Sequence, residues 1–176
     1  MKIAPTFHTE RLRLRSFTLE DAADVQRLTS HPDVASTTDV MEQPCEDETA
    51  EEWIQWCHKE FEKGTIANYA ITLRTNGTLI GMVGLVFRNH LPYNDASLGY
   101  WIGKPYWNCG YATEAAKAMV AYGFREHDID LIYADYSKRN PASGRVMQKI
   151  GMHYAYDLSE DDMIRYRILK SELAEK

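Results

Sequence analysis

The sequence has no apolar run that approaches the roughly 18 residues needed to span a membrane. Its first six residues, MKIAPT, lack the hydrophobic block of a secretory signal peptide. We therefore expect no membrane partner and a cytoplasmic location. Intrinsic disorder is disfavoured, because aromatic residues make up 11% of the chain and the net charge is only −6.

Cysteine is scarce. The three cysteines, Cys45, Cys57 and Cys109, are odd in number and form no CxxC pair. This argues against a disulfide framework and a structural zinc site, so we expect reduced thiols and no metal. Basic residues are outnumbered by acidic ones, 20 to 26. Nucleic acid is therefore an improbable main partner, since it favours a basic surface, whereas a cationic substrate such as an amine is compatible with the charge.

Internal repeats, low-complexity tracts and Pro/Gly/Ser-rich linkers are also missing, and 176 residues suit a single domain, residues 1–176. Helices are expected to begin at Thr18, at Asp47 or Thr49, at Thr113 and at Pro141. Hydrophobic periodicity predicts strands at residues 12–15, 69–73, 79–87, 97–102, 131–136, 153–156 and 164–169. This order of elements predicts an α/β domain with a mixed sheet and helices on its faces.

The most informative segment, residues 99–115, has the pattern of a strand, a tight loop and a helix start. Residues 108–113 would present successive backbone N–H groups near the positive end of the helix dipole, which is an arrangement that binds phosphate or diphosphate. The segment contains neither a GxxxxGK[ST] P-loop nor a GxGxxG fingerprint. On physical grounds alone, a plain loop before a helix capped by Thr113 explains the pattern equally well.

A second polar patch follows the next predicted strand. Asn140 stands at a strand-to-helix junction, where its side chain can cap the helix or bond a ligand amide, and capping is the commoner role. Ser143 is expected to face outward from the first helical turn. Lys138, Arg139 and Arg145 form either a solvated basic surface or a phosphate clamp. One helix and one strand separate the two patches, so we expect both at the same edge of adjacent strands.

Together these segments resemble the GCN5-related N-acetyltransferase (GNAT) superfamily, and within it the Rim-type branch of ribosomal-protein N-terminal acetyltransferases. The resemblance covers nearly the whole chain. It depends on patterns in the right order: TERLRLR at residues 9–15, GYWI at 99–102, GYATEA at 110–115, NPAS at 140–143 and KIGM at 149–152. It implies the GNAT fold, a mixed, mostly antiparallel sheet of six to seven strands with splayed central strands and about four helices on both faces.

The resemblance also implies direct acetyl transfer from acetyl-CoA to a primary amine. The family's [RQ]xxGx[GA] loop falls on residues 107–112, with Trp107 in place of the polar first residue. Its amides would hold the diphosphate of the coenzyme, and an amide near Trp101 would stabilise the oxyanion. The cofactor-binding residues implied in this way are Trp101, Ile102, Gly103, Asn108, Cys109, Gly110, Tyr111, Ala112, Thr113 and Asn140. Cys109 would be a loop bystander rather than a nucleophile.

Ser143 is the catalytic residue that the resemblance implies, as the acid that protonates the departing CoA thiolate. The glutamate base that some Rim-type enzymes carry after this helix is absent from residues 151–156, GMHYAY. The base is therefore open, and a water relay, Asp95, His31 and His153 are the candidates. This absence also leaves open an alternative function, a non-catalytic acyl-CoA-binding or regulatory module on the same fold.

The acetyl acceptor is open as well, because a protein N-terminus, a polyamine-like metabolite and an aminoglycoside-like drug each present a primary amine. Aromatic side chains could line its groove: Trp53, Trp56, Tyr93, Tyr100, Tyr106 and Trp107. Trp53, however, lies at helical spacing and is better explained by core packing. The acidic residues Glu42, Glu46, Asp47 and Glu48 either attract a basic acceptor or favour a helix N-terminus. A homodimer is one possible assembly.

Overall fold

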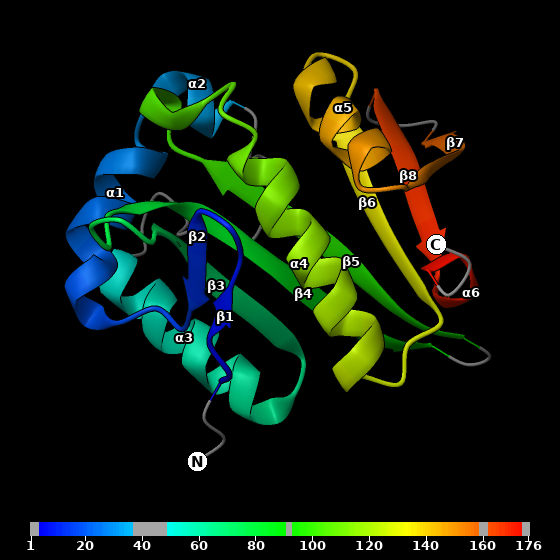
Figure 1. Cartoon of the computed structure of the whole chain (residues 1–176), viewed down its shortest axis with the longest axis horizontal. Helices are drawn as coiled ribbons and strands as arrows, with labels where there is room; N and C mark the ends of the chain where they lie inside the picture. Colours follow the sequence, from blue (N-terminus) through cyan, green and yellow to red (C-terminus); the bar gives the residue numbers. More distant parts are fainter. Residues whose placement is uncertain (1–3, 37–48, 91–92, 159–161, 174–176) are drawn as a thin grey trace.

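The computed structural model describes residues 4–36, 49–90, 93–158 and 162–173. These ranges form an eight-stranded sheet in the order β1-β2-β3-β4-β5-β6-β8-β7 (Figure 1). The strands are β1 (Phe7–His8), β2 (Leu12–Arg15), β3 (Ile66–Leu73), β4 (Leu79–His90), β5 (Tyr93–Ile102), β6 (Leu131–Ser137), β7 (His153–Leu158) and β8 (Met163–Leu169). Neighbouring strands are antiparallel except β5 and β6, which are parallel. The sheet is mixed and mostly antiparallel, as predicted.

Helices cover both faces of the sheet (Figure 1). They are α1 (Ala22–Thr29), α2 (Pro32–Ala35), α3 (Ala50–Lys63), α4 (Tyr111–Glu126), α5 (Pro141–Lys149) and α6 (Lys170–Leu173), with 3-10 turns at Leu19–Asp21 and Lys104–Tyr106. The core on one face contains buried residues of α4 and α5, and the core on the other face contains those of α1 and α3. None of the described helices is long and apolar enough to cross a membrane.

Alternation along the central strands explains how both faces become apolar. On β3, Tyr69 and Ile71 pack into the core below α4, whereas Ala70 between them packs into the core with α1 and α3. On β4, Val83 and Met82 divide in the same way. A strand that is buried on both faces reads as a nearly continuous apolar run, which is why residues 69–73 and 79–87 were recognisable in the sequence.

The start of α3 shows that Thr49 caps the helix, which is one of the two candidate caps, Asp47 and Thr49, in the sequence. The Thr49 hydroxyl accepts from the Glu52 amide (3.2 Å), and the Glu52 carboxylate accepts from the Thr49 amide (2.9 Å). This reciprocal capping box begins the helix at Ala50. The other candidate cap, Asp47, lies outside the described residues, together with Glu42, Glu46, Glu48 and Cys45. Gly64 ends the helix in the left-handed conformation (φ 76°), which glycine adopts without strain.

The parallel junction between β5 and β6 is short. β5 pairs with β4 from Tyr93 to Ile102, but it pairs with β6 only from Asp95↔Leu131 to Ser97↔Tyr133. The described parts of the two strands form no pair beyond Ser97, and Figure 1 shows them separating toward the N-terminal end of α4. The predicted splay of the central strands is confirmed.

Three details differ from the sequence-based expectations. Strand β1 was not predicted, because two residues that pair with β2 are too short to show a periodicity. It raises the number of described strands to eight. The four-residue helices α2 and α6 were not predicted for the same reason. The helix expected from Thr113 begins two residues earlier, at Tyr111, for a reason that lies in the preceding loop.

Candidate active site

The loop before α4 turns twice through the left-handed backbone conformation, at Asn108 (φ 61°) and at Gly110 (φ 81°). Gly110 is therefore the N-cap of α4, and Thr113 lies within the first turn instead of capping it. The first helical hydrogen bond runs from the Glu114 amide to the Gly110 carbonyl (3.1 Å). Among the described residues, the amides of 108–113 donate no backbone hydrogen bond. Exposed amides at a helix N-terminus suit an anion such as a diphosphate.

A contact between residues far apart in sequence anchors this loop. The Glu114 carboxylate accepts from the Arg11 amide (2.8 Å), from Arg11 Nε (2.7 Å) and from the Thr9 hydroxyl. Arg11 Nη1 also donates to the Cys109 carbonyl (2.9 Å), and the guanidinium lies 4.6 Å from the centre of the Tyr111 ring. Burial alone would raise the pKa of Glu114, but the hydrogen bonds from Thr9 and Arg11 hold it below its ordinary value. The carboxylate is thus ionised and fixes both sides of the turn.

This anchor was not predicted from the sequence, although both residues belong to segments that carry the resemblance. Arg11 belongs to TERLRLR and Glu114 to GYATEA. No local spacing connects the two segments, because Arg11 and Glu114 are 103 positions apart in the sequence. The signal that could have joined them is the opposite charge of the two side chains.

Backbone and side-chain contacts hold the turn between β5 and the loop, and the backbone bond of Gly103 leaves it no free amide. The Gly103 amide donates to the Ile80 carbonyl (2.8 Å), and a Cβ at this position would lie 2.5 Å from Leu28 Cδ2. The Trp107 indole N–H donates to the Ile102 carbonyl. The side chains of Trp101 and Ile102 are buried in the two cores. Trp101 and Ile102 therefore present mainly backbone atoms to the gap. Gly103 allows Leu28 to pack closely against the backbone of the turn.

Across the gap, Asn140 stands at the start of α5. Its amide donates to the Ser137 carbonyl (2.7 Å), and its carbonyl accepts from the Ser143 amide (3.1 Å). Its half-buried side chain makes no capping hydrogen bond to the helix. Capping, the commoner role for such a residue, is therefore wrong here, and the side-chain amide is left to meet a ligand.

Ser143 was expected to face outward, and this expectation is wrong. Ser143 is half-buried, and its Oγ lies 2.9 Å from the hydroxyl of Tyr100, which also donates to the Ser143 carbonyl (3.0 Å). Burial raises the pKa of Tyr100 to about 12, and the hydrogen bond with Ser143 opposes this rise. The next residue, Gly144, lies so close to the Tyr136 ring that a Cβ would approach its Cζ to 2.6 Å. Ser143 and Gly144 thus face inward, because Ser143 contacts Tyr100 and Gly144 contacts Tyr136.

The opposite face of the sheet carries Asp95, one of the candidate bases. Asp95 lies at the closed end of the gap, in the first of the three β5–β6 pairs. Its Oδ1 atom is buried without a hydrogen-bond partner among the described residues. Around it, the Tyr133 ring packs under the guanidinium of Arg165, at 4.1 Å from its centre, and Arg88 lies 6.0 Å from the same ring. An unsatisfied buried carboxylate oxygen is costly, so this atom is expected to receive a donor.

The two candidate histidines lie elsewhere. His31 is exposed, and its Nδ1 accepts from the Asp33 amide (3.2 Å) at the start of α2. His153 is on the edge strand β7, separated from β6 by β8, and lies 3.9 Å from Glu172. Of the three named side chains, only Asp95 is on a strand that borders the gap.

The remaining candidates divide between core, surface and undescribed positions. Trp53 is 2% exposed and packs edge-on against Phe17, with ring centres 5.1 Å apart, so its assignment to the core is confirmed. Tyr106 and Trp56 are half-buried against the core with α1 and α3, and the side chain of Tyr93 lies outside the described residues. In the basic cluster, Lys138 is 3.0 Å from Asp157 and is thus already paired.

Cys57 is buried and Cys109 is exposed, and the described residues form no disulfide with either. No group of three or more His, Cys, Asp or Glu side chains in the described ranges is placed to hold a metal ion.

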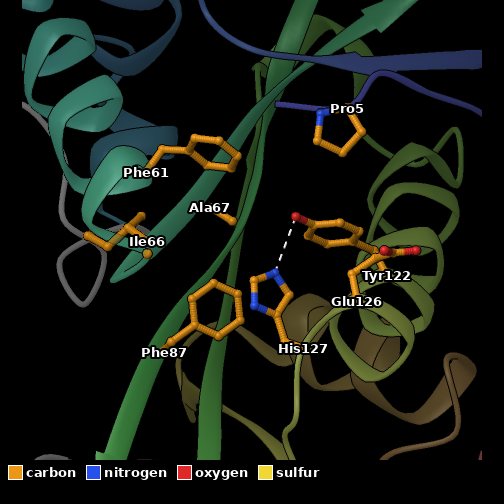
Figure 2. A pocket seen from close by; sticks show the side chains of 9 residues that line it. Pro5, Phe61, Ile66, Ala67, Phe87, Tyr122, Glu126 and His127 are labelled. Atoms are coloured by element: carbon orange, nitrogen blue, oxygen red, sulfur yellow. Dashed lines mark hydrogen bonds between the residues drawn. The ribbon is translucent and has the colours of Figure 1, made fainter. Parts of the chain in front are cut away.

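A hollow of about 220 Å³ lies at the far end of α4 from the loop. Figure 2 shows its lining, in which the Phe87 ring stacks on His127 (centres 4.1 Å apart) and the His127 ring bonds the Tyr122 hydroxyl (3.2 Å). Tyr122, which lines the hollow, is 11 residues beyond the start of α4 at Tyr111, so about 16 Å of helix separate the hollow from the loop. This aromatic hollow is therefore separate from the gap that collects Ser143, Asn140 and the free amides.

These features can be compared with known proteins. A family model described as "Acetyltransferase (GNAT) domain" matches residues 11–153. The chain belongs to the GNAT acetyltransferase family. It is 33% identical over 145 residues to the uncharacterized N-acetyltransferase YnaD of Bacillus subtilis, covering 82% of this chain and 80% of YnaD.

Solved GNAT structures share the fold. An acetyltransferase of the family from Bacillus anthracis has a TM-score of 0.76 at 28% identity and covers 95% of this chain and 99% of its own. RimJ of Mycobacterium smegmatis, solved in complex with CoA-disulfide, has a TM-score of 0.74 at 20% identity over 92% of this chain and 83% of its own. The latter likeness shows the fold alone. The GNAT fold and N-acetyltransferase activity expected from the sequence are confirmed, and members of the family use acetyl-CoA and an amine acceptor.

Proposed function

We propose that this chain, as one domain, moves an acetyl group from acetyl-CoA directly to a primary amine in the gap between β5 and β6. The observation that carries the proposal is the early end of β5–β6 pairing at Ser97 and Tyr133, next to a loop with unpaired amides. An exposed strand edge offers hydrogen bonds to an extended ligand, and a helix N-terminus offers them to an anion. Acetyl-CoA has both parts, an amide-containing arm and a diphosphate.

The residues present fit this coenzyme in the following way. The main chain of Asn108, Cys109, Gly110, Tyr111, Ala112 and Thr113 would hold the diphosphate. The main chain of Trp101 and Ile102 lies on the edge of β5 that β6 leaves unpaired, where the arm would run, and Asn140, at the start of α5, would bond the arm through its side chain. Gly103, whose amide is already bonded to Ile80, contributes by allowing the tight turn.

The chemistry needs a proton donor for sulfur and a proton acceptor for the amine. Bound acetyl-CoA supplies the activated acyl group. As the amine nitrogen bonds to the acyl carbon and the carbon–sulfur bond breaks, the Ser143 hydroxyl gives its proton to the thiolate and takes one back from water. The proton lost by the amine passes through a relay of waters toward Asp95, which lies six residues along β5 from Trp101 and thus about 20 Å away, and an amide near Trp101 stabilises the oxyanion.

These two proton-transfer groups lie on opposite faces of the sheet. Residues of β5 on the face of α4 and α5 include Ala96 and Leu98, whereas Trp101 packs with α1 and α3. By alternation, Tyr100 with its partner Ser143 is on the first face and Asp95 is on the second. The acetyl group would thus pass through the gap, from a donor on one face to an amine that arrives from the other.

For the acceptor, we propose a protein N-terminal α-amine of the Rim type ahead of a small-molecule amine. An α-amine has a pKa of about 7.7 to 8.0, against about 10.4 for an alkylamine, and therefore needs less help from a base. Of the described carboxylates on the two strands that border the gap, Asp135 is paired with Arg165 (2.7 Å), which leaves Asp95 for that role. A homodimer and a cytoplasmic location remain predictions from the sequence.

Calorimetric titration with acetyl-CoA tests the proposal first, and we expect a dissociation constant in the micromolar range. No binding at high micromolar concentration would refute it. Mass spectrometry of reactions with N-terminal peptides, polyamines and aminoglycosides should then show the gain of one acetyl group. Binding without acetylation of any amine would instead indicate the regulatory module.

The role of Ser143 has its own test. We expect Ser143→Ala to lower kcat by about 10²-fold, the usual range for loss of a general acid, with little change in acetyl-CoA affinity. Ser171→Ala, in the exposed helix α6, is the matched control. An unchanged kcat for Ser143→Ala across the pH range would remove the acid role.

A further inference from the structure

The Tyr100 hydroxyl reaches across the gap between the parted strands. Tyr100 lies on the part of β5 that has no partner in β6, and Ser143 lies on α5, which follows β6. The Tyr100 oxygen is 2.9 Å from Ser143 Oγ and 3.0 Å from the Ser143 carbonyl oxygen. One phenol thus contacts both oxygen atoms of the proposed acid.

Counting protons shows that these two contacts are not independent. The Tyr100 hydroxyl has one proton to donate, and the carbonyl of Ser143 can only accept. When the phenol donates to that carbonyl, its contact with Oγ requires Ser143 to donate its own proton to Tyr100. When the phenol donates to Oγ instead, the Ser143 proton is released for another acceptor. The direction of the phenol proton therefore decides whether Ser143 can protonate a leaving group.

We propose that Tyr100 is a positioning residue for acetyl transfer, which donates its proton to Ser143 Oγ and directs the Ser143 proton into the gap. This inference rests on the proposed role of Ser143. A donor aimed at an oxygen that is losing its own proton stabilises the negative charge that develops there, and such charge-assisted hydrogen bonds are stronger than neutral ones. Tyr100 itself stays protonated and forms no bond to substrate.

The surroundings of Tyr100 support this role. Ser143 is its hydrogen-bond partner among the described residues, and burial is the main cause of its raised pKa, with no charged group contributing. The phenol therefore keeps its proton over the whole physiological range. Packing of Gly144 on the Tyr136 ring already fixes the first turn of α5. The hydroxyl of Tyr100 is thus not required to hold the helix in place.

The decisive experiment is a double-mutant cycle with Tyr100→Phe and Ser143→Ala. We expect Tyr100→Phe to lower kcat about tenfold, the effect of one hydrogen bond worth about 1.4 kcal/mol, with acetyl-CoA affinity within about twofold of wild type. The double variant should be no slower than Ser143→Ala, because Tyr100 acts through that serine. Losses that multiply, or a wild-type kcat for Tyr100→Phe, would overturn the proposal.

Tyr122→Phe is the matched control. It removes a phenol hydroxyl bonded to His127 at the far end of α4 (Figure 2) and should leave kcat unchanged. If Ser143→Ala keeps full activity, the acid role in the proposed function has failed and the inference about Tyr100 falls with it. If Ser143→Ala is slow and Tyr100→Phe is normal, only the inference fails.

A readout that needs no turnover completes the test. In protein labelled with 3-fluorotyrosine, the fluorine resonance of Tyr100 is identified by its loss in Tyr100→Phe. We expect this resonance to shift in Ser143→Ala and not in Ser171→Ala, because only the former removes the hydroxyl bonded to the ring. An unmoved resonance in Ser143→Ala would contradict the contact and overturn the proposal, even if Tyr100→Phe proved too unstable to assay.

Discussion

The two long edges of β5 are used in opposite ways. Toward β4 the strand forms ten residue pairs, from Gly81↔Ile102 to His90↔Tyr93, and toward β6 it forms three. Antiparallel pairing along the first edge satisfies the backbone and holds the sheet together. Along the second edge the pairing ends at Ser97, so the rest of the edge is left for a ligand. One strand thus supplies both the rigid support and the binding edge.

Side chains follow the same division. On the β4 side the approach is so close that a Cβ at Gly81 would collide with the Trp101 carbonyl oxygen. On the β6 side the neighbours are polar, namely Tyr100, Ser143 and Asn140. Close backbone packing thus characterises the β4 edge, which stabilises the sheet. Hydrogen-bonding side chains characterise the β6 edge, where we propose that acetyl transfer takes place.

The strongest way to break this contrast is Gly81→Ala. Because the added Cβ meets backbone rather than a flexible side chain, the β4–β5 ladder must shift, and we expect a loss of about 3 kcal/mol in the free energy of unfolding. Urea denaturation measures it. Gly77→Ala is the control: its Cβ would meet open space, and its positive φ should cost about 1 kcal/mol. Equal losses would show that the close approach is unimportant.

At the closed end of the gap, Asp95→Asn tests which group accepts the amine proton. With an α-amine acceptor at pH 7, we expect kcat to fall about 10²-fold. The deficit should shrink above about pH 8, where the amine loses its proton without a base. Asp128→Asn, at an exposed position, should have no effect. A deficit that is the same at pH 7 and pH 9, or none at all, would remove Asp95 from this role.

On the open edge, Asn140→Ala distinguishes ligand binding from helix capping. Because the side chain does not cap α5, we expect little change in stability and a rise of about five- to tenfold in the dissociation constant of acetyl-CoA, the effect of one lost hydrogen bond. Thr49→Ala should do the reverse: the loss of a real cap should cost about 1 kcal/mol of stability without changing affinity. Calorimetry and thermal unfolding of both variants measure this contrast.

The smallest expected effect concerns the anchor of the loop. Glu114→Gln weakens the bonds from Arg11 and Thr9, and we expect acetyl-CoA affinity to fall about threefold, because a partly exposed ion pair contributes less than about 1 kcal/mol. Since the folded pKa of Glu114 is lowered, its stabilising effect is present above the unfolded pKa of about 4.3 and is lost as pH falls through the folded value. The stability difference between wild type and variant should thus be constant from pH 6 to 8 and vanish in acid. A difference that stays the same down to the lowest pH at which both proteins remain folded would contradict this account.

Local signals made much of the fold predictable. The capping box at Thr49, the terminal Gly64 and the apolar runs of β3 and β4 each act over a few residues, and each was visible in the sequence. Strand β1 and helices α2 and α6 were not, because elements of two to four residues have no periodicity to detect.

The candidate site was predictable in its loop and not in its cross-strand contacts. The small residues before α4 indicated exposed amides, although the left-handed turn at Gly110 moved the helix start from Thr113 to Tyr111. The Tyr100–Ser143 contact joins residues 43 positions apart, and no local rule places a serine of a first helical turn against a tyrosine of another strand. The sequence could not choose Asp95 from the other candidate bases. The topology does so, because His31 and His153 lie on elements that do not border the gap.

The three-rung junction between β5 and β6 also bears on how the chain folds. Strands β3, β4 and β5 are successive hairpins, and β7 and β8 form another, so each group can assemble from contacts between near neighbours in sequence. The junction joins strands on either side of a 16-residue helix, and contacts of greater sequence separation form later. We expect two pieces to assemble first and to meet last at these rungs. The unpaired stretch beyond Ser97 would then mark the boundary between the two pieces.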